Sequence, residues 1–250
     1  MSGHSKWHSI KHKKMATDAK RGKMFTKFIR EIMMASKTGG GNPDTNPRLR
    51  MVIDKAKSFN MPNDNIQRAI KKGSGEDGGV TFEQVTYEGY GPGGVALFVE
   101  VLTDNKNRSA SEIRSIFSKH NGNLGGAGSV AWIFERKGVI NVGKDKIGED
   151  ELMEIALEAG AEDMTLEGDV YEIIVMPEKF EEVKNTLTSK KIEISDANVS
   201  FVPKNTVKVE GKAAEQVLKL LETLEDHDDV QAAYANFDIS DEVLESIQSG

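Results

Sequence analysis

Residues 66–87 read IQRAIKKGSGEDGGVTFEQVTY. Ile66 and Ile70 keep helical spacing, and Gly73 is the kind of residue at which helices end. The next six residues have the composition of a linker, and from Thr81 to Tyr87 apolar and polar residues alternate as in a half-buried strand. A helical domain therefore ends here, and a sheet-containing domain begins.

The charge of the chain changes sign at the same place. Residues 1–73 contain 17 Lys and Arg against 5 Asp and Glu, a net charge of +12, whereas residues 74–250 contain 16 bases and 35 acids, or −19. This separation predicts a basic module that meets a polyanion and an acidic body that keeps the chain soluble. We therefore expect nucleic acid, either DNA or ribosomal RNA, to be the partner of residues 1–73.

Length and composition exclude several classes of protein. The chain has 250 residues, more than one core usually organises, and no apolar run long enough to span a membrane. It has no cysteine, which excludes disulfides, thiolate nucleophiles and sulfur-ligated zinc. No apolar stretch follows the charges of the N-terminus, so no secretory signal is predicted. We expect a cytoplasmic protein that does not contact membranes; its oligomeric state is left open, with a monomer slightly favoured.

Residues 1–22, MSGHSKWHSIKHKKMATDAKRG, predict a flexible basic arm. Aromatic and imidazole groups that alternate with lysines can stack on bases while the ammonium groups neutralise phosphates. A solvated tail is the alternative. His4, His8 and His12 would align three imidazoles on a helix, but the nearby lysines would repel a metal ion, so we predict none. The nucleic-acid-binding residues predicted in the arm are Lys6, Trp7, His8, Lys11, His12, Lys13, Lys14, Lys20 and Arg21.

Residues 23–76 predict a bundle of three short amphipathic helices. At about 100° per residue, the apolar side chains from Phe25 to Met33 share one face of the first helix, and cations share the opposite face. Gly39-Gly-Gly-Asn-Pro ends this helix, Asn46 caps the second, and the third ends at Gly73. A merely solvated face is the alternative, and nothing marks a helix-turn-helix. The predicted phosphate contacts in the bundle are Lys23, Lys27, Arg30, Arg48, Arg50, Arg68, Lys71 and Lys72.

The acidic body begins with strands at 81–87 and 95–102. The Gly89-Tyr-Gly-Pro-Gly-Gly segment between them matches the dinucleotide-binding pattern G-x-G-x-x-G. That fingerprint requires a helix directly after the glycines, whereas a strand follows here, so we predict a hairpin and no cofactor.

A helix around Ile113–Phe117 follows, with Ser109 and Glu112 as its expected capping box, and then a strand at 129–135. The loop before this helix is rich in polar residues. Ordinary turn chemistry explains much of that polarity, but loops between a strand and a helix often carry binding groups. The residues of this possible binding loop are Asp104, Asn105, Asn107 and Arg108.

Residues 136–204 predict the order β-α-β-β-α-β, which is ferredoxin-like. A final β-α-β unit at 205–240 cannot bury itself alone, so we expect it to complete the sheet begun at 79–135, with 136–204 inserted between the two parts. The predicted fold class is α+β multidomain: an N-terminal three-helix bundle followed by two α+β domains, the third inserted in the second.

Residues suited to catalysis are scarce. Outside the arm the histidines are His120 and His227, and no nucleophile elbow, P-loop or zincin motif is present. Asp226, Asp228 and Asp229 could hold a hard cation, as a metal-dependent hydrolase would require, but consecutive acids in a turn are more often a solvated surface. We predict a protein that is not an enzyme.

Several motifs carry a family resemblance. They are Gly3-His-Ser-Lys-Trp, Ile10-Lys-His-Lys-Lys, Asn46-Pro-Arg-Leu-Arg, Met61-Pro, Ile66-Gln-Arg-Ala-Ile-Lys-Lys-Gly, Tyr87-Glu-Gly-Tyr-Gly-Pro-Gly-Gly, Thr103-Asp-Asn-Lys-Asn-Arg and Gly122-Asn-Leu-Gly. Over essentially its whole length the chain resembles the YebC family of bacterial regulatory proteins, whose mitochondrial relative is a translational activator of cytochrome oxidase.

The resemblance implies a helical bundle followed by two α+β domains, with no catalytic activity. It also implies one of two functions. Some members are described as DNA-binding transcriptional regulators, and others as ribosome-associated factors that relieve stalling at proline-rich sequences. Phosphate neutralisation is common to both, so the residues favour neither. A protein-interaction scaffold that uses the acidic body is a further alternative.

Overall fold

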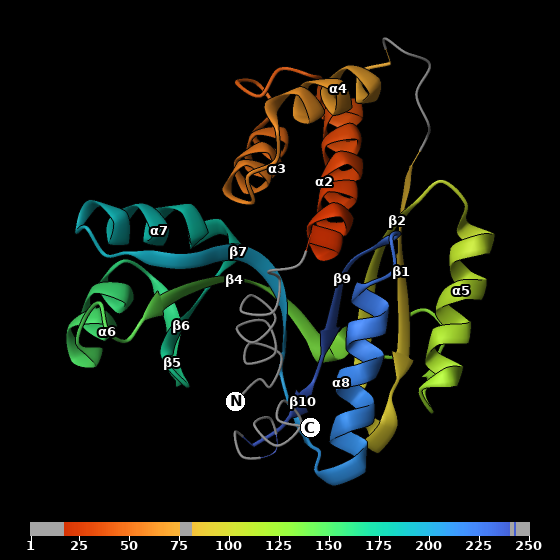
Figure 1. The fold of residues 1–250 in the computed structure, drawn as a ribbon. Helices are drawn as coiled ribbons and strands as arrows, with labels where there is room; N and C mark the ends of the chain where they lie inside the picture. The colour runs from red at the N-terminus through yellow and green to blue at the C-terminus, as the bar shows by residue number, and fades with distance from the viewer. Residues whose placement is uncertain (1–17, 76–81, 241–242, 244–250) are drawn as a thin grey trace.

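The computed structural model describes residues 18–75, 82–240 and 243, and for 18–20 the backbone alone. Figure 1 shows a helical bundle at the top, one α+β domain below it on the right and a second on the left. This arrangement confirms the predicted α+β class, with the third domain inserted in the second. Among the described helices, none is long and apolar enough to cross a membrane.

The bundle consists of α2 (Asp18–Gly39), α3 (Pro47–Ser58) and α4 (Asn63–Gly73). Asn46 caps α3 as predicted, because its side-chain oxygen accepts from the Leu49 N–H at 3.1 Å. Its Nδ2 also donates to the carbonyl of Ala35 at 2.9 Å, which ties α3 to α2. Gly73 allows α4 to approach α2, since a Cβ there would lie 2.4 Å from the Met33 carbonyl oxygen. The helices therefore form one small core.

The middle domain has a four-stranded sheet in the order β3-β1-β2-β9. Its strands are β1 (Glu83–Tyr90), β2 (Ala96–Thr103), β3 (Asn123–Leu124) and β9 (Val230–Ala235). A 3₁₀ turn at Pro92–Gly94 joins β1 to β2 as an antiparallel hairpin. The hairpin prediction for the glycine-rich segment is thus confirmed.

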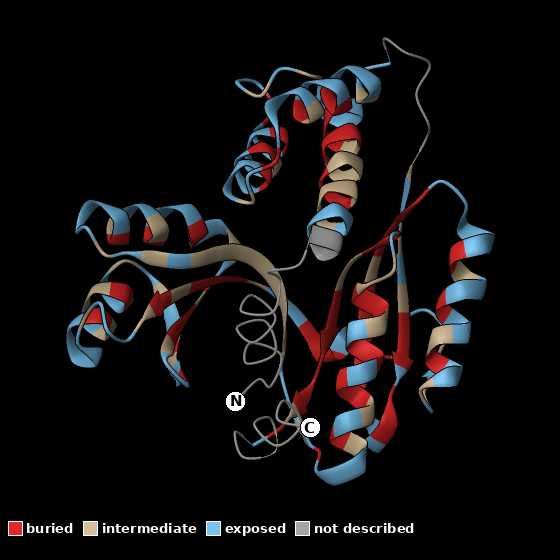
Figure 2. Cartoon of the chain, in the orientation of Figure 1, coloured by how far each residue is buried: buried red, intermediate tan, exposed pale blue. Residues whose placement is uncertain are grey.

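Successive side chains of β2 point to opposite faces of the middle domain's sheet, and each face packs in a different apolar cluster. Leu97, Val99 and Val101 pack with helices α5 (Lys106–Lys119) and α8 (Gly211–Glu225) in one core. Ala96 and Phe98 lie in a second apolar cluster with Phe134, at the junction with the third domain. Figure 2 shows the buried residues of α8 and of the strands behind it in red.

The C-terminal part of the chain returns to the middle domain. Strand β9 pairs antiparallel with β2, with Phe98 opposite Tyr234. The short strands β8 (Val207–Lys208) and β10 (Phe237–Asp238) pair in parallel in a separate two-stranded sheet, so the prediction that the C-terminal unit completes the middle sheet holds for β9 and is wrong for the strand at 207–208. Residues more than 100 positions apart therefore share one sheet, because the third domain is inserted between them.

The third domain has the sheet order β5-β6-β4-β7. Its elements are β4 (Phe134–Gly143), α6 (Glu149–Glu158), β5 (Ala161–Glu167), β6 (Val170–Val175), a 3₁₀ turn (Pro177–Lys179), α7 (Phe180–Ser189) and β7 (Ile194–Pro203). Each pair of neighbouring strands is antiparallel. This is the predicted ferredoxin-like order, and the two helices pack in the same core as the sheet.

The predicted strand at 129–135 is wrong. Residues Ala131–Ile133 form a 3₁₀ turn, and the strand begins only at Phe134. The cause is the buried side chain of Glu88, whose carboxylate accepts the N–H groups of Gly128, Val130 and Ala131 at 2.7 Å. Burial alone would raise the pKa of Glu88, but these three hydrogen bonds outweigh it and lower that pKa. The segment is therefore folded around a carboxylate instead of extended.

Candidate nucleic-acid interface

The predicted nucleic-acid contacts fall into three groups in the structure. Lys6, Trp7, His8, Lys11, His12, Lys13, Lys14 and the side chain of Lys20 lie outside the described residues. Those that are exposed on the bundle are Arg21, Arg48, Arg50, Arg68, Lys71 and Lys72. Lys23, Lys27 and Arg30, which we call the α2 cations, instead contact the chain's own middle domain.

The α2 cations bind the turn after α8, residues 225–229, which we call the acidic turn. Lys27 is 6% exposed and donates to the carbonyl of Glu225 at 2.5 Å. Arg30 donates to the carbonyl of Asp228 and to Oδ1 of Asp229, both at 2.5 Å. Lys23 forms a more exposed ion pair with Asp226 at 3.2 Å. In this structure the side of α2 that we predicted to meet phosphate is occupied by the protein's own carboxylates and carbonyls.

Asp229 is the centre of this contact. The residue is 2% exposed, so the prediction of a solvated acidic surface is wrong at this position. Its Oδ1 accepts from Arg30, whereas its Oδ2 accepts from Arg108 at 2.7 Å, from Ser109 at 2.6 Å and from Thr103 at 3.2 Å. One carboxylate thus joins the bundle to the start of α5.

Charge and hydrogen bonds keep Asp229 ionised. Burial alone would raise its pKa, but the hydrogen bonds from Ser109, Arg108 and Arg30 outweigh burial and lower the pKa to about 2. The ordinary value is 3.8. The folded state therefore holds this carboxylate charged over nearly the whole pH range.

This pKa predicts a pH dependence of stability. A folded-state pKa below the unfolded one stabilises the protein above about pH 4, and that stabilisation is lost as the pH falls toward 2. The native chain should therefore have a higher unfolding free energy than Asp229→Asn at pH 5. This difference between the two proteins should be smaller by about 2 kcal/mol at pH 2. Denaturant unfolding at several pH values measures it, with Asp228→Asn as the control. A difference independent of pH would contradict the assignment.

Most of the polar residues in the possible binding loop before α5 make hydrogen bonds or ion pairs within the protein. Asn105 caps α5 by accepting from the N–H of Arg108 at 3.1 Å, and Asp104 pairs with the Arg108 side chain at 3.0 Å. The predicted capping box of Ser109 and Glu112 is wrong, because the helix begins at Lys106 and the Ser109 hydroxyl is buried on Asp229. Asn107 is exposed. Arg108 is the member that reaches the contact between the domains.

Exposed cations remain on the other two helices of the bundle, and on α3 they lie on both flanks: at about 100° per residue, Arg48 and Lys55 lie on the side opposite Arg50 and Lys57. These cations make no salt bridge within 4 Å to another described residue, and each of the two helices carries a single acid, Asp54 or Asp64. Figure 2 shows the outer sides of α3 and α4 largely in pale blue. We call the exposed cations of these two helices together the α3–α4 face, with Arg48 and Lys55 on its side nearest Glu31 of α2; its members are Arg48, Arg50, Lys55, Lys57, Arg68, Lys71 and Lys72.

A cleft of about 840 Å³ lies beside the acidic turn, between α2 and α5. Glu112, His227 and Asp229 have ligand atoms within 4.8 Å of one another there, the spacing of a metal site. Both Asp229 oxygens, however, already accept from arginines. His227 Nδ1 accepts the Asp229 N–H at 3.1 Å, so its other nitrogen carries the proton when the ring is neutral and points it at Glu112. These partners fit an ion-pair network better than a metal ligand set.

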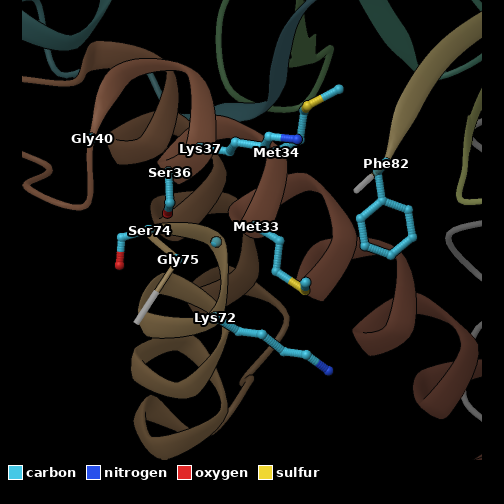
Figure 3. Close-up of a pocket in the computed structure, with 10 residues that line it drawn as sticks. Met33, Met34, Ser36, Lys37, Gly40, Lys72, Ser74, Gly75 and Phe82 are labelled. Carbon is cyan, nitrogen blue, oxygen red and sulfur yellow. The ribbon is translucent and has the colours of Figure 1, made fainter. Parts of the chain in front are cut away.

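A second cavity, of about 390 Å³, lies where the bundle meets the strand that follows it. Lys37 comes from α2, Lys72 from α4 and the Phe82 ring from the chain just before β1 (Figure 3). The guanidinium of Arg30 lies 5.6 Å from the centre of the same ring. The residues that line this cavity include no carboxylate or imidazole, so they offer no metal ligand set.

Comparisons with known proteins follow the same division of the chain. A family profile described as the TACO1/YebC protein N-terminal domain matches residues 5–76, and one described as the TACO1/YebC second and third domain matches residues 82–237. The chain belongs to the TACO1/YebC family. This confirms the resemblance seen in the sequence motifs.

TACO1/YebC relatives of high identity share the whole length of the chain. A protein of Dictyoglomus thermophilum is 61% identical over 99% of this chain and 100% of its own. A protein of Natranaerobius thermophilus is 55% identical over 98% of this chain and 100% of its own. Both are named probable transcriptional regulatory proteins. The crystal structure of a conserved hypothetical protein from Aquifex aeolicus has a TM-score of 0.82 at 50% identity, covering 91% of this chain and 94% of that one.

Proposed function

We propose that this chain is a cytoplasmic, non-enzymatic regulator of gene expression that binds DNA through its basic N-terminal module. The observation that carries the proposal is the α3–α4 face, seven exposed cations against two acids on two adjacent helices. Surfaces without a polyanionic partner normally intersperse both signs of charge. The names of the relatives support a role in transcription.

The chemistry of this face suits phosphates better than bases. Lysine and arginine on the outer sides of short helices neutralise the backbone and position the protein without reading sequence. Lys55 and Lys57 end α3, and Lys71 and Lys72 end α4, where cations are also favoured by the helix dipole. The duplex backbone is therefore the expected ligand, and ribosomal RNA, which presents the same phosphates, is the alternative target.

The test uses three substitutions on α4. Arg68, Lys71 and Lys72 changed together to alanine should weaken binding to duplex DNA by roughly tenfold to fiftyfold near physiological salt. The slope of log affinity against log salt should become less steep by about 3, because each phosphate contact contributes about 0.9. Fluorescence anisotropy of a labelled duplex over a range of salt concentrations measures both.

A matched control removes three exposed lysines from the acidic body, Lys190, Lys212 and Lys219. It changes the net charge by the same amount, so a general electrostatic effect would lower both affinities alike. We expect the control to bind as the native chain does. Equal losses in the two triple variants, or a native chain whose affinity is independent of salt, would contradict the proposed function.

A further inference from the structure

The contact between the α2 cations and the acidic turn is strongly polar. Apolar side chains of α2 such as Phe28 and Ile32 belong to the bundle's own core, which is distinct from the core of the middle domain. Phe82 is the described residue of the body that packs against the bundle's core. Charges and hydrogen bonds therefore account for most of the attraction, and a competing anion can replace them.

Another part of the same contact is repulsive. Glu31 lies on α2, and burial raises its pKa; Lys55 and Arg48 on α3 act against that rise, and the negative charge of Glu100 on β2 adds to it. Glu100 in turn accepts from the hydroxyl of Tyr234 at 3.0 Å. Two carboxylates thus repel across the boundary that the α2 cations hold together.

Asp229 is arranged so that the bundle can leave it. Arg30 uses only Oδ1, whereas Oδ2 is held within the middle domain by Arg108, Ser109 and Thr103. Departure of Arg30 would leave the carboxylate paired, with its free oxygen open to water. Lys27 likewise contacts a backbone carbonyl, which water can satisfy. Separation therefore leaves Asp229 paired, which lowers the usual cost of opening a contact to a buried charge.

We propose that the acidic turn is an intramolecular competitor of nucleic acid: the α2 cations bind phosphates only when they leave the acidic turn. This inference rests on the proposed function and adds a regulation of its site. While the α2 cations remain on the acidic turn, which we call the closed state, the chain presents the α3–α4 face to nucleic acid. The phosphates of the nucleic acid then replace the carboxylates of the acidic turn as partners of the α2 cations. Binding and domain opening are then coupled, since the ligand favours the state in which more cations reach it.

The test locks the contact closed. Because the chain has no cysteine, Lys23→Cys with Asp226→Cys places its only two thiols on either side of the contact. A short bismaleimide joins them, and the same double variant capped with N-ethylmaleimide remains free to open. The joined form should bind duplex DNA about tenfold more weakly. Its salt slope should be less steep by about 2, because Lys27 and Arg30 stay on the acidic turn.

The outcomes separate the regulation from the proposed function. If the joined and capped forms bind DNA with equal, measurable affinity, the acidic turn does not compete with nucleic acid. The proposed DNA binding would still stand. Absence of binding in both forms and in the native chain overturns both. A second variant, Asp226→Asn, should bind about twofold to fivefold more tightly than the native chain, since it weakens only an exposed pair. Asp145→Asn, an equal charge change in the third domain, should bind unchanged.

Discussion

Replacing Asp229 with alanine is expected to lower the free energy of unfolding by about 3 kcal/mol. Removing one member of a buried ion pair typically costs about 3–5 kcal/mol, because its partners lose their hydrogen bonds in a place that water reaches poorly. Arg30 and Arg108 are 17% and 41% exposed, so both can turn toward water, and the lower end of that range applies. The hydroxyls of Thr103 and Ser109 are buried and cannot turn toward water.

The neighbouring residue supplies a control. Asp228 is exposed and contributes only its backbone carbonyl to Arg30, so Asp228→Ala should change stability by less than about 0.5 kcal/mol. Denaturant unfolding followed by circular dichroism compares the two variants at one pH. A loss below about 1 kcal/mol for Asp229→Ala would mean that the network around this carboxylate adds little to the fold.

Much of the fold follows from local patterns in the sequence. Asn46 before Pro47 predicted the start of α3, and a strand directly after the Gly89–Gly94 segment predicted a hairpin instead of a dinucleotide site. The β-α-β-β-α-β rhythm of residues 136–204 predicted the third domain. The return of the C-terminal unit followed from a broader argument, that a lone β-α-β cannot bury its apolar face.

Two of the predictions from the sequence that were wrong are the strand at 129–135 and the capping box of Ser109 and Glu112. Both errors have the same physical cause, which is hydrogen bonding to a side chain far away in the sequence. Glu88 folds residues 128–131 into a turn from about 40 positions away, and Asp229 removes Ser109 from its expected cap from 120 positions away. Local propensity carries no information about such partners. The acids of both interactions are buried, and a sequence alone does not separate a buried acid from a surface one.

The candidate site shows the same limit. Helical spacing correctly placed Lys23, Lys27 and Arg30 together on α2, but their partner is a turn about 200 residues later. One signal in the sequence pointed to it: a basic module and an acidic body in one chain attract each other as well as their ligands. The acidic turn, Glu225-Asp-His-Asp-Asp, is the densest run of acids in the chain, which made it a candidate partner for the basic module.

Removal of residues 1–17 is expected to weaken nucleic-acid binding on the order of 100-fold near physiological salt. This change removes Lys6, Lys11, Lys13 and Lys14 and keeps α2 whole, since that helix begins at Asp18. Four lost phosphate contacts would make the salt slope less steep by about 3 to 4. Changing the four lysines to glutamine in the full chain should reproduce most of the loss, and a loss below about threefold would show that the arm does not bind.

The same arm distinguishes the two targets. Stacking of an aromatic ring on an unpaired base is worth about 1–3 kcal/mol, whereas duplex DNA offers phosphates and few open base faces. Trp7→Ala should therefore weaken co-sedimentation with ribosomes by about tenfold if ribosomal RNA is the target, and should leave duplex binding nearly unchanged if DNA is. Excess duplex as a competitor completes the comparison: ribosome binding that it does not displace, and that Trp7→Ala weakens, would make this chain a translation factor and replace the transcriptional proposal.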